Sequence, residues 1–475
     1  AATKKAFNAT KAITDARPTA IAVQLVECSI LSNVSVSDGS ERVADTIRLF
    51  DARTAPEGLV GLAAYLPSPG STDRETRDGV AEILAQVASR GDAAVAEYTR
   101  RFDGSDLTAA EWELPLEACH EALARIPVAL RTALERAAAQ VRDYHLRQVD
   151  LGFRDERPDG TLLGMRVTPV DAAGLYVPGG KAAYPSSVLM NAIPAVVAGV
   201  RDLVAVTPPL GANDAVLAAL AISGVTRVFR IGGAHAIAAL AYGTATVPRV
   251  DKIVGPGNKW VAEAKRQLFG QVGIDMVAGP TEVLILADDS ADPAVIAADL
   301  IAQAEHDEDA LAWLATTSEA LAHAIPAALD AALAVAPRAD VARASLARNG
   351  LVVLVHDRAG LVEVANRRAV EHLEIVTRDA EALAEQVRHA GAIFIGHSTP
   401  VPVGDYIAGP SHVLPTSGTA RFASPLGVYD FVKRTSLVRY SRAQLLADAP
   451  HVIALAESEG LFGHAEAVRR RVERT

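Results

Sequence analysis

The pattern of apolar and polar residues changes along the 475-residue chain. Over residues 76–102, apolar side chains recur at helical spacing, and Gly91 interrupts them. A second helical stretch covers residues 116–146. After Asp159-Gly160, short β-branched runs begin to alternate with alanine-rich helical segments. Such alternation predicts parallel sheets that are covered by helices.

The alternation forms two successive series of strands, so we predict an α/β fold with two tandem domains. The first series comprises residues 173–177, 202–207, 227–231 and 252–254. The second series comprises residues 282–287, 312–315, 351–356, 373–376 and 392–395. Helices are expected near residues 185–198, 213–222, 234–242, 258–269 and 292–304.

Domain boundaries follow from these series. We predict a disordered tail over residues 1–45 and an N-terminal helical part over 46–173 that joins the first α/β domain. The first α/β domain covers residues 174–281, and the second covers 282–425. The last part, over 426–475, is predicted to be a C-terminal arm for a partner subunit. The tail carries Lys and Arg among small residues, which leaves an organelle-targeting segment or a misassigned start as alternatives.

Composition narrows the class of protein. The chain has 46 Lys and Arg against 57 Asp and Glu, a net charge of −11, which disfavours nucleic acids and anionic membranes as partners. No apolar run reaches the ~20 residues of a membrane-spanning helix. Cys28 and Cys119 are too few for a disulfide scaffold or an all-cysteine zinc site, and they fit a reducing, cytoplasmic compartment. Any metal would therefore be held by His, carboxylate or amide groups.

Two glycine turns follow predicted strands and open predicted helices, although no complete G-x-G-x-x-G occurs. Gly255-Pro256-Gly257-Asn258 is one, and Gly232-Gly233-Ala234-His235 is the other. Backbone amides at such a helix start can bind an anion. The alternative is that both sequences form only tight turns that allow close packing.

Three groups of polar side chains are candidates for chemistry. Gln303 and His306 lie three positions apart on a predicted helix, where they either converge on a ligand or belong to a solvated helix end. Glu371-His372 combines an acid and an imidazole at the start of a strand, or is a surface pair. The third group comprises Asp405, His412, Glu459 and His464. With Gln303 and His306, it supplies imidazole, carboxylate and amide ligands that suit zinc.

These segments together resemble the histidinol dehydrogenase family, and the match runs from about residue 46 to the C-terminus. The motifs that carry the resemblance are Gly174-Leu175-Tyr176-Val177-Pro178-Gly179-Gly180, Pro185-Ser186-Ser187-Val188-Leu189-Met190-Asn191, Val254-Gly255-Pro256-Gly257-Asn258, Gly273-Ile274-Asp275, Ala278-Gly279-Pro280-Thr281-Glu282, Gln303-Ala304-Glu305-His306-Asp307, Glu371-His372-Leu373-Glu374 and Gly409-Pro410-Ser411-His412-Val413-Leu414-Pro415-Thr416.

The resemblance implies two incomplete Rossmann-like domains, a homodimer, and a four-electron oxidation of L-histidinol to L-histidine through L-histidinaldehyde, with two NAD+ used in succession. It also implies one zinc ion per subunit, held by Gln303, His306, Asp405 and His464. These four residues, with Thr281, His372, His412 and Glu459, would surround the substrate.

The catalytic roles implied by the resemblance fall on Glu371 and His372. His372 would accept the hydroxyl proton, and Glu371 would activate the water that hydrates the aldehyde. Glu459 and His464 lie five positions apart, ~140° around a helix, so Gly460 or Gly463 must break the helix if both face one site.

The implied NAD contacts are Tyr176, Asn258 and the residue at position 235. The family usually has Gln where this chain has His235, and an imidazole can replace only one of the two hydrogen bonds of an amide. The rival interpretations are a related zinc and NAD alcohol dehydrogenase for another small polar alcohol, and a non-catalytic protein that binds a metal or nucleotide.

Overall fold

The computed structural model describes residues 41–42, 46–66, 73–179 and 184–473. The predicted tail therefore lies outside the described residues except for Glu41–Arg42, which form strand β1. Cys119 is buried and unpaired with another cysteine. Within the described ranges, no helix has the length and apolar character needed to cross a membrane.

The first sheet has the order β10-β9-β6-β7-β8-β3, and only β3 runs antiparallel to its neighbour. Its strands are β3 (Glu113–Leu114), β6 (Ala172–Tyr176), β7 (Asp202–Val206), β8 (Arg227–Phe229), β9 (Lys252–Val254) and β10 (Gly273–Ile274). Its parallel strands follow the order third, second, first, fourth, fifth along the chain. This is the Rossmann order without the sixth strand.

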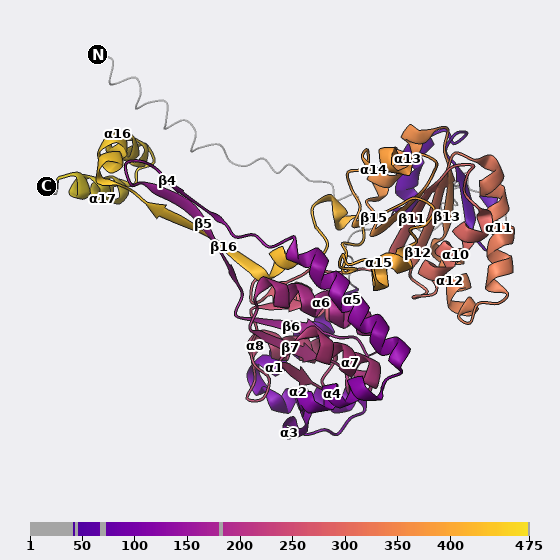
Figure 1. The fold of residues 1–475 in the computed structure, drawn as a ribbon, viewed down its shortest axis with the longest axis horizontal. Helices are drawn as coiled ribbons and strands as arrows, with labels where there is room; N and C mark the ends of the chain where they lie inside the picture. The colour runs from indigo at the N-terminus through magenta and orange to yellow at the C-terminus, as the bar shows by residue number, and fades with distance from the viewer. Residues whose placement is uncertain (1–40, 43–45, 67–72, 180–183, 474–475) are drawn as a thin grey trace, which may run out of the picture. The chain divides into compact units, whose positions relative to one another are not determined.

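Helices cover both faces of this sheet (Figure 1). One face packs against α4 (Leu116–Arg125), α5 (Val128–Leu146), α6 (Pro185–Ala198) and α7 (Asp214–Ser223). The other packs against α1 (Arg74–Arg90), α2 (Asp92–Asp103), α8 (Gly233–Tyr242) and α9 (Lys259–Leu268). Two short elements lie in the connections: α3 (Ala109–Trp112) between α2 and β3, and η2 (Pro209–Gly211) between β7 and α7. Gly91, with φ of 54°, separates α1 from α2, as its position in the apolar pattern predicted.

The second sheet has the order β1-β2-β13-β12-β11-β14-β15. Its strands after β1 are β2 (Arg48–Asp51), β11 (Glu282–Ala287), β12 (Leu311–Thr316), β13 (Leu351–Leu354), β14 (His372–Val376) and β15 (Ala392–Ile395). From β13 to β15 the parallel strands repeat the order of the first sheet. The predicted α/β fold with two parallel sheets is thus confirmed.

This sheet also lies between two layers of helices. One layer comprises α10 (Pro293–Ala304), α11 (Glu319–Leu333) and α12 (Ala339–Asn349). The other comprises η1 (Gly58–Tyr65), α13 (Arg358–Arg368) and α14 (Ala380–Ala384). Two short helices, α15 (Val401–Tyr406) and η3 (Thr419–Arg421), follow β15.

Residues 46–66 differ from the predicted division, which placed them in a part joined to the first domain. β2 pairs with β13 in parallel, Leu49 opposite Val352, and thus extends the second sheet. Phe50 and Leu62 are buried in the core of that sheet. The strand has four residues, too few for a clear alternation in the sequence.

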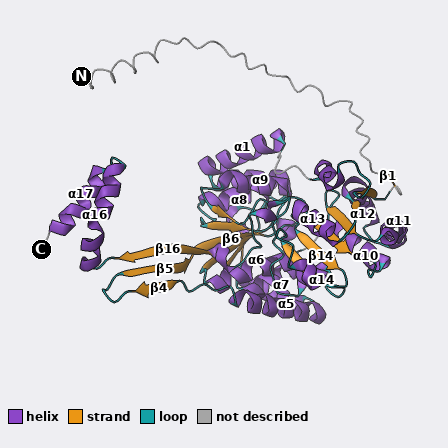
Figure 2. Ribbon diagram, turned by 90° about the horizontal axis from the view of Figure 1, so that it is seen from above, coloured by secondary structure: helices purple, strands orange, loops and turns teal. Residues whose placement is uncertain are grey.

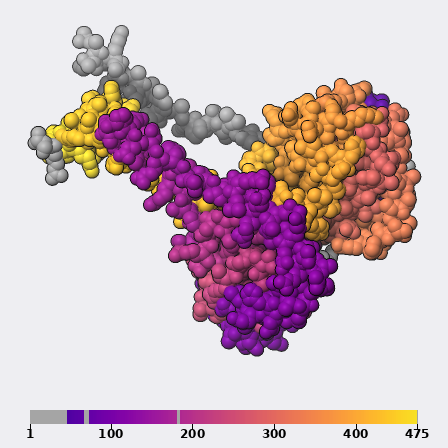
Figure 3. All heavy atoms as spheres, in the orientation of Figure 1, coloured from indigo at the N-terminus to yellow at the C-terminus, as the bar shows by residue number. Residues whose placement is uncertain are grey.

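A third, antiparallel sheet joins distant parts of the chain (Figure 2). It consists of β4 (Phe153–Glu156), β5 (Leu162–Pro169) and β16 (Val432–Arg439), which follows η4 (Val428–Phe431). Two helices, α16 (Arg442–Ser458) and α17 (Phe462–Glu473), follow β16 and pack on each other. In Figure 3 the β4–β5 hairpin and the C-terminal residues share one surface. The predicted C-terminal arm thus includes a hairpin from the N-terminal half.

Candidate functional site

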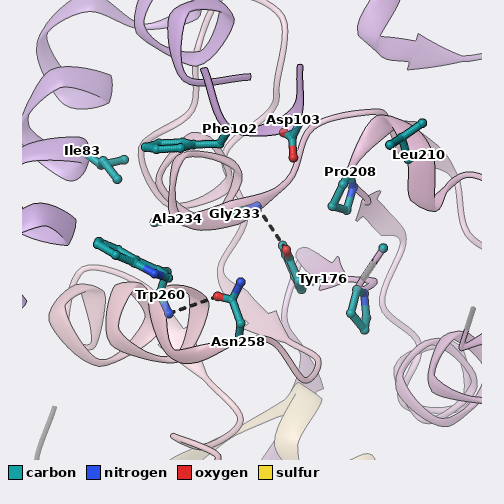
Figure 4. A pocket seen from close by; sticks show the side chains of 12 residues that line it. Ile83, Phe102, Asp103, Tyr176, Pro208, Leu210, Gly233, Ala234, Asn258 and Trp260 are labelled. Carbon is teal, nitrogen blue, oxygen red and sulfur yellow. Dashed lines mark hydrogen bonds between the residues drawn. The ribbon is translucent and has the colours of Figure 1, made fainter. Parts of the chain in front are cut away.

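The first sheet carries a cavity at the carboxyl ends of β6 and β9, the two strands between which the strand order reverses. Ligands of open α/β sheets bind at this position. The cavity has a volume of about 530 Å³ and is largely apolar (Figure 4). Its described lining comprises Ile83, Phe102, Asp103, Tyr176, Pro178, Gly179, Pro208, Leu210, Gly233, Ala234, Asn258 and Trp260.

Two of the predicted cofactor residues, Tyr176 and Asn258, line this cavity together. The hydroxyl of Tyr176 accepts a hydrogen bond of 3.1 Å from the backbone N–H of Gly233, at the start of α8. Burial raises the pKa of Tyr176 to about 12, so the phenol stays protonated and can donate. Asn258 caps α9, because its side-chain oxygen accepts from the N–H groups of Trp260 and Val261.

Gly255 fixes the turn that brings Asn258 to the cavity. Its φ is +114°, and a Cβ atom there would lie 2.3 Å from the carbonyl oxygen of Tyr176. Its N–H donates to Asp275 over 2.8 Å, and its carbonyl accepts from Lys265 over 3.0 Å. Asp275 and Lys265 form a buried ion pair. The glycine is therefore required both by conformation and by space.

His235 lies beside the cavity and is not among its lining residues. Its side chain is fully buried in α8, and its Nε2 lies 3.2 Å from the hydroxyl oxygen of Thr99 on α2. Burial lowers the pKa of this imidazole to about 3, so the ring is neutral. In this arrangement the imidazole joins two helices, and its predicted contact with the cofactor stays a prediction.

The second group of candidates gathers at the amino ends of β11 and β14. Glu371 and His372 are both buried, which excludes the interpretation of a surface pair. Glu371 Oε2 accepts from the hydroxyl of Thr281 over 2.7 Å and from the N–H of Glu282 over 2.8 Å. The side-chain amide of Gln303 donates to the hydroxyl oxygen of Thr281 over 2.7 Å. A chain of hydrogen bonds thus orients Glu371.

The ring of His372 has one defined tautomer when it is neutral. Its Nδ1 lies 3.0 Å from the carbonyl oxygen of Glu282, which can only accept, so Nδ1 carries the hydrogen. Nε2 has no hydrogen-bond partner among the described residues and lies 3.5 Å from Asp405 Oδ1. Although burial favours the neutral ring, the carboxylates of Glu371 and Asp405 raise the pKa of His372 well above its usual range.

Asp405 brings the remaining candidates toward His372. It lies on α15 and, with His412, lines a second cavity of about 610 Å³. Burial would raise the pKa of Asp405, but His372, His412 and His306 together lower it. His412 Nδ1 lies 3.0 Å from the carbonyl oxygen of Asp405, and burial lowers the pKa of its ring. Asp405 therefore contacts His372 and His412, and the charge of His306 acts on its carboxylate.

At the end of α10, Gln303 and His306 differ: the first is buried in the site, and the second belongs to a solvated helix end. Gln303 is 4% exposed and bonded to Thr281, whereas His306 lies beyond the helix end with the exposed residues 307–309. In the described part of the chain, no three His, Cys, Asp or Glu side chains converge as metal ligands would. Gln303, His306 and Asp405 thus form at most a partial ligand set.

Glu459 directly follows the end of α16, His464 lies on α17, and both are exposed. The helix breaks between them: α16 ends at Ser458, α17 begins at Phe462, and Gly460 has φ of +72°. The helix break that the two residues need in order to face one site is therefore present at Gly460, while their meeting at one site stays a prediction. The pair belongs to no metal cluster within the described chain.

Two buried acids near this site were not predicted as functional residues. Glu282 forms an ion pair of 2.9 Å with Arg368 and accepts from the N–H of Ser417, so it ties β11 to the loop after His412. Glu374, on β14 two positions after His372, is 1% exposed and accepts from the N–H of Val401 over 2.6 Å. A charged residue inside an otherwise buried strand was the available signal.

Comparisons with known proteins agree with this arrangement. A family model described as "Histidinol dehydrogenase" matches residues 67–472. Pseudomonas fluorescens and Pseudomonas aeruginosa each have a protein of that name. The first is 53% identical over 405 residues, covering 85% of this chain and 92% of the relative. The second is 54% identical over 404 residues, covering 84% and 92%.

A solved structure of the same name extends the comparison to three dimensions. The crystal structure of histidinol dehydrogenase from Elizabethkingia anophelis superposes with a TM-score of 0.84 at 30% sequence identity. The superposition covers 90% of this chain and 98% of the other. Sequence and structure therefore point to the same relatives along nearly the whole described chain.

Proposed function

The chain belongs to the histidinol dehydrogenase family, and from that premise we propose that it oxidises L-histidinol to L-histidine through L-histidinaldehyde, the last step of histidine biosynthesis. The observation that carries the proposal is the buried pair Glu371 and His372, oriented by Thr281 and Gln303 beside Asp405. A buried acid and a buried base side by side suit the proton transfers of this reaction, which involve both the substrate hydroxyl and the hydrating water.

His372 acts as the general base of the first oxidation. Its Nδ1–H donates to the carbonyl of Glu282, so Nε2 is the nitrogen that carries the lone pair once the ring is neutral. Zinc bound by Asp405 would offset one of the two carboxylates that raise the pKa of the ring, which favours the neutral form. Nε2 takes the hydroxyl proton while the carbinol carbon loses its hydride. The product of this step is the aldehyde, and the proton on the imidazole balances the charge.

Glu371 acts on the water that hydrates the aldehyde. Its Oε2 is held by Thr281 and Glu282, which leaves Oε1 to take a proton from water as the oxygen bonds to the carbonyl carbon. As that bond forms, the imidazolium of His372 returns its proton to the carbonyl oxygen, which completes the gem-diol and leaves His372 neutral. The gem-diol then has a hydroxyl for His372 to deprotonate and a C–H bond for the second hydride transfer. Two oxidations and one hydration convert the alcohol to the carboxylic acid.

The cavity of the first sheet is the proposed NAD site. When bound, NAD+ accepts the hydride from the substrate in each oxidation. Tyr176 offers a protonated hydroxyl, Asn258 offers an amide at the start of α9, and Gly233 leaves room for close approach. His235 supports this wall by holding α8 against α2.

The donor chemistry of the second site fits zinc. The amide nitrogen of Gln303 donates to Thr281, so its oxygen is available as a ligand beside the imidazole of His306 and the carboxylate of Asp405. We assign these three residues and His464 as zinc ligands. When bound, zinc would position the imidazole and amine of the substrate, near Thr281, His412 and Glu459.

We further propose that the active unit is a homodimer in which a second copy supplies Glu459 and His464. Both residues are exposed in the C-terminal helical pair, Glu459 at the end of α16 and His464 on α17, and the ligand set at Asp405 is incomplete within the described part of one chain. Exposed apolar side chains on the same helices, Leu455 and Phe462 among them, give this region a surface suited to a partner.

The experiment that tests the function uses the purified full chain with zinc, NAD+ and L-histidinol. We expect NADH to accumulate in a ratio of two per histidine formed. A panel of other small polar alcohols serves as the comparison. Absence of NADH from histidinol, with turnover of another alcohol, would contradict the proposed substrate.

A further inference from the structure

Asp103 is the one acidic residue among the described residues that line the cavity of the first sheet. It is the last residue of α2, and Figure 4 shows its carboxylate pointing toward Gly233 and Tyr176. Its side chain is 16% exposed, and Oδ2 is buried without a hydrogen-bond partner. A buried carboxylate oxygen without a partner is costly, so its position calls for an explanation.

The surroundings of Asp103 provide no compensating charge. The nearby imidazole of His235, 3.7 Å from Oδ2, is neutral because burial lowers its pKa to about 3. None of the described lining residues is Lys, Arg or His. The carboxylate also lies at the carboxyl end of α2, where the helix dipole places partial negative charge. Three unfavourable features therefore coincide at a cavity-facing group.

The position of Asp103 matches that of a ribose-binding acid, which the strands of the first sheet do not supply. In complete dinucleotide-binding folds, an acid some 20 residues after the glycine turn binds the ribose hydroxyls. Here the first strand of the sheet, β6, is followed by Val177-Pro178-Gly179, and the next strand, β7, ends at Val206 and is followed by Thr207-Pro208. Asp103 lines the cavity together with Pro208 and so supplies the acid from α2 instead (Figure 4).

We propose that Asp103 is the residue that binds the vicinal hydroxyls of the adenosine ribose and selects NAD over NADP. A carboxylate accepts hydrogen bonds from both hydroxyls of an unphosphorylated ribose. A 2′-phosphate would bring further negative charge against an uncompensated carboxylate. This inference rests on the proposed use of NAD by the first sheet.

Equilibrium binding of the reduced dinucleotides tests the inference without turnover. Trp260 lines the cavity, so quenching of tryptophan fluorescence in the purified full chain reports the binding of NADH and NADPH. We expect Asp103→Asn to weaken NADH by about 10-fold or more, the loss of a hydrogen bond to a charged group. The preference for NADH over NADPH should shrink by a similar factor.

Controls separate this role from a general effect on α2. Asp106→Asn removes an exposed carboxylate three residues away that pairs with Arg100, and it should change neither affinity. Asp103→Ala tests the same contact without an amide, and thermal melting checks that both variants fold. An unchanged preference for NADH in both folded variants would overturn the inference.

Competition by adenosine diphosphate locates the ribose. This probe lacks the nicotinamide half, so its affinity should fall in Asp103→Asn as much as that of NADH. If only NADH weakens, the carboxylate contacts the other ribose and the proposed selection is wrong. If the unaltered chain binds neither dinucleotide, the proposed function itself fails and this inference fails with it.

Discussion

The five central parallel strands have the same order in the two sheets, but the candidate site lies at the carboxyl ends of the strands in the first sheet and at their amino ends in the second. In the first sheet, the strands β6 and β9 end in glycine turns that open into a cavity. In the second, the equivalent strands β11 and β14 carry the candidate catalytic residues at their amino ends. Strand order alone therefore does not decide where chemistry takes place.

The difference arises from the turns. Gly255 lets backbone approach backbone after β9, and the space beyond it stays open. After β11 the chain continues into Asp288, whose carboxylate accepts from the N–H groups of Ser290 and Arg378. That carboxylate ties the ends of β11 and β14 together and uses the amides that a ligand would need. The lesson is that turn residues assign ligand sites within a fixed topology.

The sharpest test of this division of labour is His372→Ala. We expect turnover to fall by about 10²- to 10⁴-fold, because the general base is lost. NADH binding to the first sheet should stay unchanged in a fluorescence titration. His323→Ala, an exposed imidazole on α11, is the control for removal of a histidine. A parallel loss of NADH affinity in His372→Ala would contradict separate roles for the two sheets.

Gly255→Ala tests the open end of the first sheet. The new Cβ would lie 2.3 Å from a carbonyl oxygen at a φ of +114°, so we expect a loss of about 3 kcal/mol in the free energy of unfolding. Gly270→Ala has a similar φ of +99° with no heavy atom within 4 Å of its Cβ. Chemical unfolding of the two variants should therefore separate the cost of the backbone conformation from the cost of the clash with the carbonyl oxygen. Equal losses in both variants would show that space at Gly255 is unimportant.

Glu374→Gln tests whether the buried carboxyl group in the core of the second sheet is protonated in the folded state. Burial, with the nearby Asp299, raises the pKa of Glu374 from 4.5 to about 8 in the folded state. The unfolded chain therefore releases this proton first, and stability falls as pH rises from about 4.5 toward 8. Glu374→Gln should remove this loss, a gain on the order of a few kcal/mol near the upper limit.

The measurement is guanidinium unfolding at about pH 5 and about pH 8. The amide oxygen of the new Gln can still accept from the N–H of Val401, which preserves the contact with α15. Glu381→Gln, an exposed acid on α14, is the control. If Glu374→Gln follows the same pH dependence as the unaltered chain, Glu374 is ionised in the folded state.

The smallest expected effect compares two helix caps in the first sheet. Asn258 caps α9 and lines the cavity, whereas Asn213 caps α7 outside the cavity lining. Replacing either by Ala should cost about 1 kcal/mol of stability. Only Asn258→Ala should also weaken NADH in the fluorescence titration. Equal NADH affinities in the two variants would leave Asn258 as a cap alone.

Sequence patterns predicted the regular parts of this fold well. β9, β11 and β15 have their predicted bounds, because short apolar strands between helices leave clear runs in the sequence. The pairing of β2 with β13 and of β5 with β16 could not be predicted, since register between distant segments leaves no local signal. Both pairings changed the domain division.

The candidate site shows a similar limit. The motifs identified Glu371 and His372, while the chain of hydrogen bonds through Thr281 and Gln303 requires three segments to meet. The burial of His235 against Thr99 was equally inaccessible, because α2 and α8 are far apart in the sequence. Side-chain chemistry could be inferred from the sequence, but the partners of each side chain could not.

The pairing of β5 with β16 has a consequence for the order of folding. The hairpin of β4 and β5 is synthesised early, but its third strand leaves the ribosome only near the end of the chain. A two-stranded hairpin is at best marginally stable in water. β2 likewise can pair only after β13, about 300 residues later in the chain, has been synthesised. The first sheet, whose strands are close in sequence, can therefore form during synthesis, while completion of the other two depends on release of later segments.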